Sequence, residues 1–128
     1  MQGESSRVGY TCWLIRLAGC ELRCRYCDTE WARIGGNPVE VEALVSEAVA
    51  AGLHHVLVTG GEPLLQPETP ELLRRLCDER LLVALETSGT RSTEDVDPRV
   101  RTVLDVKCPG SGMADRMCWE NLDRLRSH

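Results

Sequence analysis

The chain has 128 residues and a formal net charge of −5, so it lacks the excess of basic side chains that favours nucleic-acid binding. It contains no apolar run of about 18 residues, which excludes an ordinary membrane-spanning helix. The length suits one domain but not a complete eightfold βα barrel, which takes roughly 200 residues or more. Seven cysteines without a visible secretory signal favour metal ligation in a reducing compartment, here the cytoplasm.

Apolar, β-branched runs alternate with segments of helical periodicity along the chain. Strands are expected at Tyr10–Leu17, His55–Thr59, Leu81–Glu86 and Thr102–Val106. Helices are expected at Val39–Ala51, from Thr69 through Cys77, and at Asp115–Leu125. Solid apolar strands separated by helices predict a parallel sheet with right-handed crossovers. Ligands of such sheets gather at the carboxyl ends of the strands.

The helix over residues 39–51 has the clearest boundary signals. Asn37 is expected to cap it, Pro38 to occupy its first helical position, and Glu40 to complete a capping box. Gly52 is the expected stop.

Three cysteines follow the first predicted strand in a Cys-x3-Cys-x2-Cys run, at Cys20, Cys24 and Cys27. Three thiolates can hold three irons of a four-iron cluster, and the fourth iron stays open to a small chelating ligand. A sulfonium bound there could accept an electron and break homolytically. The alternative is a structural zinc site, but zinc prefers four ligands and no second Cys pair exists here.

This run, with an aromatic residue before the last cysteine, resembles the radical S-adenosylmethionine (SAM) superfamily. The segment from Thr59 to Pro63 (TGGEP), one βα unit later, resembles the motif with which that superfamily binds the sulfonium amino group. Glu62 adds a possible carboxylate partner for a cationic amine. The resemblance implies an α/β fold: a partial (βα) barrel with a parallel sheet, incomplete at the C-terminal side, with residues 1–128 as one partial radical SAM core domain.

Three further segments narrow the resemblance to the 7-carboxy-7-deazaguanine synthases. They are Gln2-Gly3-Glu4, Arg16-Leu-Ala-Gly-Cys20 and Cys27-Asp28-Thr29. That family converts 6-carboxy-5,6,7,8-tetrahydropterin into 7-carboxy-7-deazaguanine and ammonia, on the way to queuosine and other 7-deazapurines.

The resemblance also implies roles for individual residues. The 4Fe-4S cluster would be held by Cys20, Cys24 and Cys27. Mg²⁺ would be held by Thr29. SAM would be bound by Tyr26, Cys27, Asp28, Gly60, Gly61, Glu62, Asp105, Val106 and Lys107. The pterin would be bound by Met1, Gln2, Gly3, Glu4, Arg16 and Thr59.

The resemblance further implies a homodimer and an electron donor of the flavodoxin type. Because members of the family are longer, the sequence is expected to be a fragment, truncated at both ends, whose own activity is open. Two rival functions remain at this point. One is a glycyl-radical-enzyme activase of the same superfamily, and the other is a non-catalytic metal-binding fragment.

Overall fold

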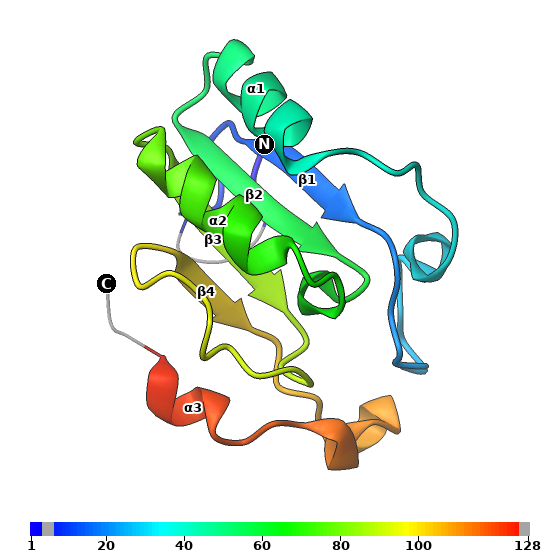
Figure 1. Ribbon diagram of the computed structural model, residues 1–128. Helices are drawn as coiled ribbons and strands as arrows, with labels where there is room; N and C mark the ends of the chain where they lie inside the picture. Colours follow the sequence, from blue (N-terminus) through cyan, green and yellow to red (C-terminus); the bar gives the residue numbers. More distant parts are fainter. Residues whose placement is uncertain (4–6, 126–128) are drawn as a thin grey trace.

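One parallel sheet organises the chain in the computed structural model, which describes residues 1–3 and 7–125 (Figure 1). Its strands, in both chain and spatial order, are β1 (Trp13–Leu17), β2 (His55–Gly60), β3 (Leu82–Thr87) and β4 (Arg101–Leu104). The helices are α1 (Val41–Ala50), α2 (Thr69–Asp78) and α3 (Asn121–Arg124). Short 3₁₀ turns are η2 (Glu30–Arg33), η3 (Pro63–Leu65), η4 (Pro109–Ser111) and η5 (Ala114–Arg116).

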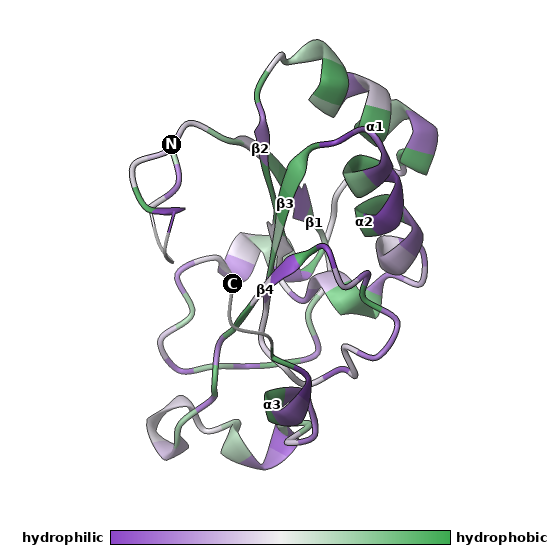
Figure 2. Cartoon of the chain, turned by 90° about the vertical axis from the view of Figure 1, so that its left-hand side faces the viewer, coloured by the Kyte–Doolittle hydropathy of each residue, from purple (hydrophilic) through white to green (hydrophobic). Residues whose placement is uncertain are grey.

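The strands are added in one direction only, from β1 to β4. Because each right-handed crossover then falls on the same face, α1 and α2 cover one side of the sheet (Figure 2). This is the arrangement of a βα barrel rather than of a doubly wound sheet. Among the described residues β4 does not pair with β1, so the barrel is partial and the predicted fold class is confirmed.

The hydrophobic core lies between the sheet and the two helices. Alternate residues of the central strands, among them Val58 and Leu85, point into it and are fully buried. On α2, Leu72, Leu73 and Leu76 form the matching stripe. Each buried side chain of this kind contributes about 1.5–3 kcal/mol, which fixes the sheet on which the strand-end loops stand.

Within residues 1–3 and 7–125, no helix lies on the opposite face of the sheet. Residues 1–3 and 7–10 lie on that side, across the sheet from α1 and α2 (Figure 2). Gln2 is buried there, and its Nε2 donates a hydrogen bond of 3.0 Å to Oε1 of Glu86 on β3.

The first strand is shorter than predicted because its expected start belongs to a turn. Gly9 has a φ of +90°, and its N–H donates to the carbonyl of Gln2. The carbonyl of Tyr10 accepts from the Gln2 N–H at 2.7 Å, and its ring packs against His55. These contacts use the groups that Tyr10 would need for pairing in β1.

The predicted start of α1 was wrong by two residues. Glu40 is the N-cap residue and makes no side-chain capping bond, so Asn37 and Pro38 lie in the preceding loop. Glycines at 35 and 36 with positive φ keep the chain turning there, and the helix begins where Val41 reaches the core. The predicted stop at Gly52 is confirmed, with φ of +66°.

The predicted helix over residues 115–125 is also wrong, since only η5 and α3 form there. Met117 is extended and buried, and its Sδ accepts from the N–H of Lys107 at 3.4 Å. The fully buried Asn121 donates to the carbonyls of Gly89 and Arg91. These tertiary contacts outweigh the helical periodicity.

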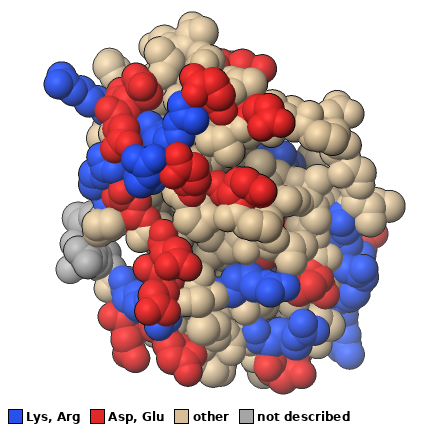
Figure 3. Space-filling model, in the orientation of Figure 1, with Lys and Arg blue, Asp and Glu red and all other residues tan. Residues whose placement is uncertain are grey.

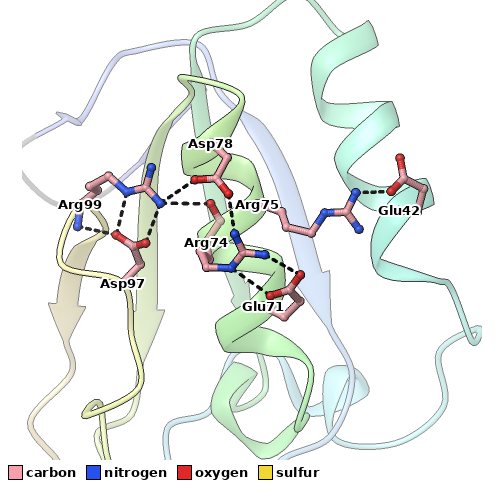
Figure 4. Close-up of polar contacts among 7 residues, drawn as sticks. All are labelled: Glu42, Glu71, Arg74, Arg75, Asp78, Asp97 and Arg99. Atoms are coloured by element: carbon pink, nitrogen blue, oxygen red, sulfur yellow. Dashed lines mark hydrogen bonds and ion pairs between the residues drawn. The ribbon is translucent and has the colours of Figure 1, made fainter.

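Charged side chains tie the loop before β4 to α2 (Figure 4). The Asp97 carboxylate accepts from the backbone N–H and the guanidinium of Arg99, which also donates to Asp78 at 2.8 Å. On the face shown in Figure 3, acidic and basic side chains are interspersed. None of the described helices is both long and apolar enough to cross a membrane.

This network predicts acid sensitivity. Hydrogen bonding to Arg99 lowers the pKa of Asp97 from its usual 3.8 to about 2. A depressed carboxyl pKa stabilises the fold above the unfolded value, and that contribution is lost as pH falls from about 4 through 2. We expect a loss of at most about 1 kcal/mol, because Arg99 is half-exposed to water. Urea unfolding at several pH values would measure it.

The matched variant is Asp97→Asn, whose unfolding free energy should change less with pH across this window than that of the parent. Equal pH slopes for the two proteins would contradict the assignment to Asp97.

Candidate functional site

A cavity of about 370 Å³ opens at the carboxyl ends of the strands. Its wall is formed by Arg16, Cys20, Cys24, Tyr26, Cys27, Asp28, Thr29, Arg33, Thr59, Gly60, Gly61, Glu86, Thr87, Ser88, Val103, Asp105 and Lys107. Two larger hollows, one beside β1 and one beside the loop before β4, are not lined by any cysteine. Of these three hollows, the one at the strand ends is where cysteines, charged side chains and hydroxyls come together.

All three predicted cluster cysteines line this cavity. Cys24 is buried and the other two are half-buried. Burial raises the pKa of the Cys20 thiol. The loop is fixed beneath by Leu22, which is almost fully buried.

The donor set suits a polynuclear cluster. Among the described residues, no three His, Cys, Asp or Glu side chains gather closely enough to bind one metal ion. Cys20, Cys24 and Cys27 all line one cavity. Three thiolates can each bind a separate iron of one cluster, whereas a structural zinc usually takes four ligands.

The glycine loop after β2 packs directly against the cysteine loop. A Cβ at Gly61 would lie 2.3 Å from the carbonyl oxygen of Gly19 and 2.7 Å from Cβ of Cys20. The N–H of Glu62 donates to the same Gly19 carbonyl at 2.8 Å. Only glycine permits this approach, which places the backbone of Gly60 and Gly61 on the cavity wall beside the cysteines.

The Glu62 carboxylate does not lie on the cavity wall. It is fully buried and accepts hydrogen bonds from Leu64 N–H at 2.9 Å, from Ser88 N–H at 2.8 Å, and from the hydroxyls of Thr87 and Ser88. The sequence suggests the Glu62 carboxylate as a partner for a cationic amine. In the structure that carboxylate is buried and bonded to the protein. The carboxylate instead joins the glycine loop to the end of β3.

A second carboxylate extends this connection to the cysteine loop. Ser88 Oγ lies 3.2 Å from Thr90 Oγ1, which donates to Glu21 at 3.0 Å, and Arg91 donates to Glu21 at 2.8 Å. Burial opposes the charge on Glu21, but the hydrogen bonds outweigh it and lower its pKa. Three loops of the site are thus held together by two carboxylates.

Polar side chains form a row across the helix-free face of the sheet. Arg16 on β1 is in register with Thr59 on β2, and Glu86 on β3 is in register with Val103 on β4. Since Val58 pairs with Leu85, the next position brings Thr59 level with Glu86. A cation, a hydroxyl and a carboxylate therefore lie side by side at the base of the cavity.

Lys107 supplies a further cation on the cavity wall. Its ammonium forms an ion pair with Asp105 and lies 5.9 Å from the ring centroid of Tyr26. Burial disfavours the charge, but the hydrogen bond and the attraction to Asp105, with smaller contributions from Cys24 and Tyr26, together outweigh it and raise the pKa of Lys107. Asp105 and Lys107 both line the cavity.

The remaining predicted residues that the structure describes do not line the cavity. Gln2 is one of them, but it donates a hydrogen bond to Glu86, which does line the cavity. Met1, Gly3 and Val106 are exposed and away from the wall. Glu4 lies outside the described residues.

The residue roles implied by the family resemblance omitted five members of the wall, Arg33, Glu86, Thr87, Ser88 and Val103. Three of them end or follow the third predicted strand, Leu81–Glu86, where hydroxyls and a carboxylate suit ribose or substrate contacts. Val103 could be found only from the register of β4, and Arg33 only from the turn η2.

Comparisons with known proteins agree with this geometry. Residues 14–106 match the family model of the radical SAM superfamily. A 7-carboxy-7-deazaguanine synthase of Chlorobaculum tepidum is 45% identical over 121 residues, covering 94% of this chain and 55% of that protein. One from Methanospirillum hungatei is 45% identical over 113 residues, covering 88% and 48%. The chain therefore spans about half the length of these relatives.

A solved structure, that of QueE from Escherichia coli, shares the fold. It superposes with a TM-score of 0.77 over 98% of this chain and 64% of that one, at 23% sequence identity.

Proposed function

Because the chain belongs to the radical SAM superfamily, we propose that it forms the cluster-binding part of a 7-carboxy-7-deazaguanine synthase, a carbon–nitrogen lyase. The substrate would be 6-carboxy-5,6,7,8-tetrahydropterin, and the products 7-carboxy-7-deazaguanine and ammonia. The observation that carries the proposal is the meeting of three thiols, the glycine loop and Arg16 on one cavity wall.

The thiols of Cys20, Cys24 and Cys27 would hold the cluster, leaving one iron for the amino-acid head of SAM. When bound, the two cofactors supply the radical that takes a hydrogen from the pterin. The close backbone approach at Gly60 and Gly61 suits the head group.

Further SAM contacts would come from the cavity wall. Tyr26 offers a ring, and Asp28, Asp105 and Lys107 offer charge. Val106 would contribute through its backbone. Glu62 supports the site from behind, because its carboxylate is already occupied by β3.

The pterin would lie over the row formed by Arg16, Thr59 and Glu86. A planar guanidinium suits bidentate binding of the substrate carboxylate. Glu86 can accept hydrogen bonds from pterin N–H groups, and Gln2 holds that carboxylate in place. Met1, Gly3 and Glu4 would add the further pterin contacts that the family resemblance implies.

Mg²⁺ would bind at Thr29, whose hydroxyl lies 3.9 Å from Cys27 Sγ. One protein oxygen suffices where the ion keeps waters and takes its other ligands from substrate.

The proposal also covers the wider setting: one partial radical SAM core domain over residues 1–128, a cytoplasmic homodimer, and a reductant of the flavodoxin type. The formal net charge of −5 does not favour nucleic acid as a partner.

The test is turnover by the anaerobically reconstituted chain with reductant, SAM, Mg²⁺ and the carboxypterin. Formation of 7-carboxy-7-deazaguanine, followed by mass spectrometry, is expected. The variant Arg16→Met should lose product while still cleaving SAM. Uncoupled deoxyadenosine from the parent chain would favour a glycyl-radical activase, and a colourless protein with one zinc and no sulfide would exclude the enzyme.

A further inference from the structure

The guanidinium of Arg16 is held from two sides. Its Nη1 donates to the carbonyl of Gly60 at 2.9 Å, and its Cζ lies 5.4 Å from the centroid of the Trp31 ring. Arg16 lines the cavity at the same time. Because stacking uses the face of the guanidinium, the N–H groups along its edge stay available to an anion.

The position of Trp31 is set by backbone contacts rather than by core packing. The indole is 69% exposed, so it adds little to the hydrophobic core. Its neighbour Ala32 is buried, donates to the carbonyl of Thr29 at 2.9 Å, and accepts from the Gly19 N–H at 2.8 Å. The turn η2 is therefore fixed to the cysteine loop and presents the ring to Arg16.

We propose that Trp31 is a positioning residue that fixes Arg16 for a substrate carboxylate. This rests on the proposed function, in which Arg16 binds the 6-carboxylate of the pterin. An arginine side chain loses rotamer freedom on binding, and a ring that restrains it beforehand reduces this loss. Trp31 thus favours a carboxylated pterin over the same ring without the carboxylate, although it does not contact the ligand.

Anaerobic calorimetry on the reconstituted protein with SAM tests this with two probes, 6-carboxy-5,6,7,8-tetrahydropterin and unsubstituted 5,6,7,8-tetrahydropterin. Trp31→Leu should raise the Kd of the carboxylated probe about two- to fivefold, the range of a cation–π contact at an exposed site. It should leave the Kd of the unsubstituted probe unchanged. Trp31→Phe, which keeps a ring, should restore most of the affinity.

The matched control is Trp119→Leu, because Trp119 is also an exposed indole, at 53%, and lies off the cavity wall. It should bind both probes as the parent does. In an Arg16→Met background, Trp31→Leu should have no further effect, since the residue acts through Arg16.

The outcomes separate the two proposals. A parent protein that binds both probes equally overturns the proposed substrate, and this inference with it. A selective parent whose Trp31→Leu variant stays equally selective overturns the role of Trp31 alone. So does a variant that loses affinity for both probes, or one whose effect persists in the Arg16→Met background.

Discussion

Replacing Cys24 by serine is expected to abolish cluster assembly. Cys24 is the most buried of the three cavity thiols, and no other cysteine lines the wall to take its place. A serine hydroxyl is a poor iron ligand because thiolate is the donor these clusters use. Iron and sulfide content after anaerobic reconstitution, with the visible absorbance, should fall close to background.

The control is Cys108→Ser, which changes an exposed thiol off the cavity wall. That variant should bind iron and sulfide as the parent does. A Cys24→Ser protein with the parent's iron and sulfide content would show that the cluster is held elsewhere.

Glu62→Gln is expected to destabilise the fold by about 2–3 kcal/mol. One carboxylate oxygen accepts from the N–H of Leu64 and the other from the N–H of Ser88. A backbone N–H can only donate a hydrogen bond. Whichever way the glutamine amide turns, its NH2 group would face the N–H of Leu64 or of Ser88 and leave that N–H without an acceptor. Because the side chain is fully buried, water cannot replace the lost bond.

Urea unfolding would measure this loss, with Glu79→Gln as a matched change at an exposed glutamate. Glu79→Gln should stay within about 0.5 kcal/mol of the parent. If Glu62→Gln kept the parent's stability but lost SAM affinity, the carboxylate would act on the ligand and not on β3.

The sequence was most informative where chemistry depends on local spacing. The cysteines lie within eight residues, so one loop had to bring them together, and all three line the cavity. Alternation of strands and helices likewise predicted the parallel sheet, which the structure confirms.

The sequence was least informative where long-range contacts decide. The motif located Glu62 but could not show that Thr87 and Ser88 would take its carboxylate. The place of Glu86 beside Thr59 depends on strand register, which periodicity alone does not set. The last predicted helix was lost to contacts of Asn121 with residues about 30 positions earlier in the chain.

The hydrogen bonds among the site loops also constrain the order of assembly. Ser88 reaches Glu62 across 26 positions, and Thr90 reaches Glu21 across 69. The Glu62–Ser88 contact spans about the same separation as the pairing of β2 with β3, whereas the Glu21–Thr90 contact closes a longer loop and is expected to form later. We therefore expect β1, β2 and β3 to pair before the cysteine loop takes its shape, so that iron and sulfide enter a nearly finished fold.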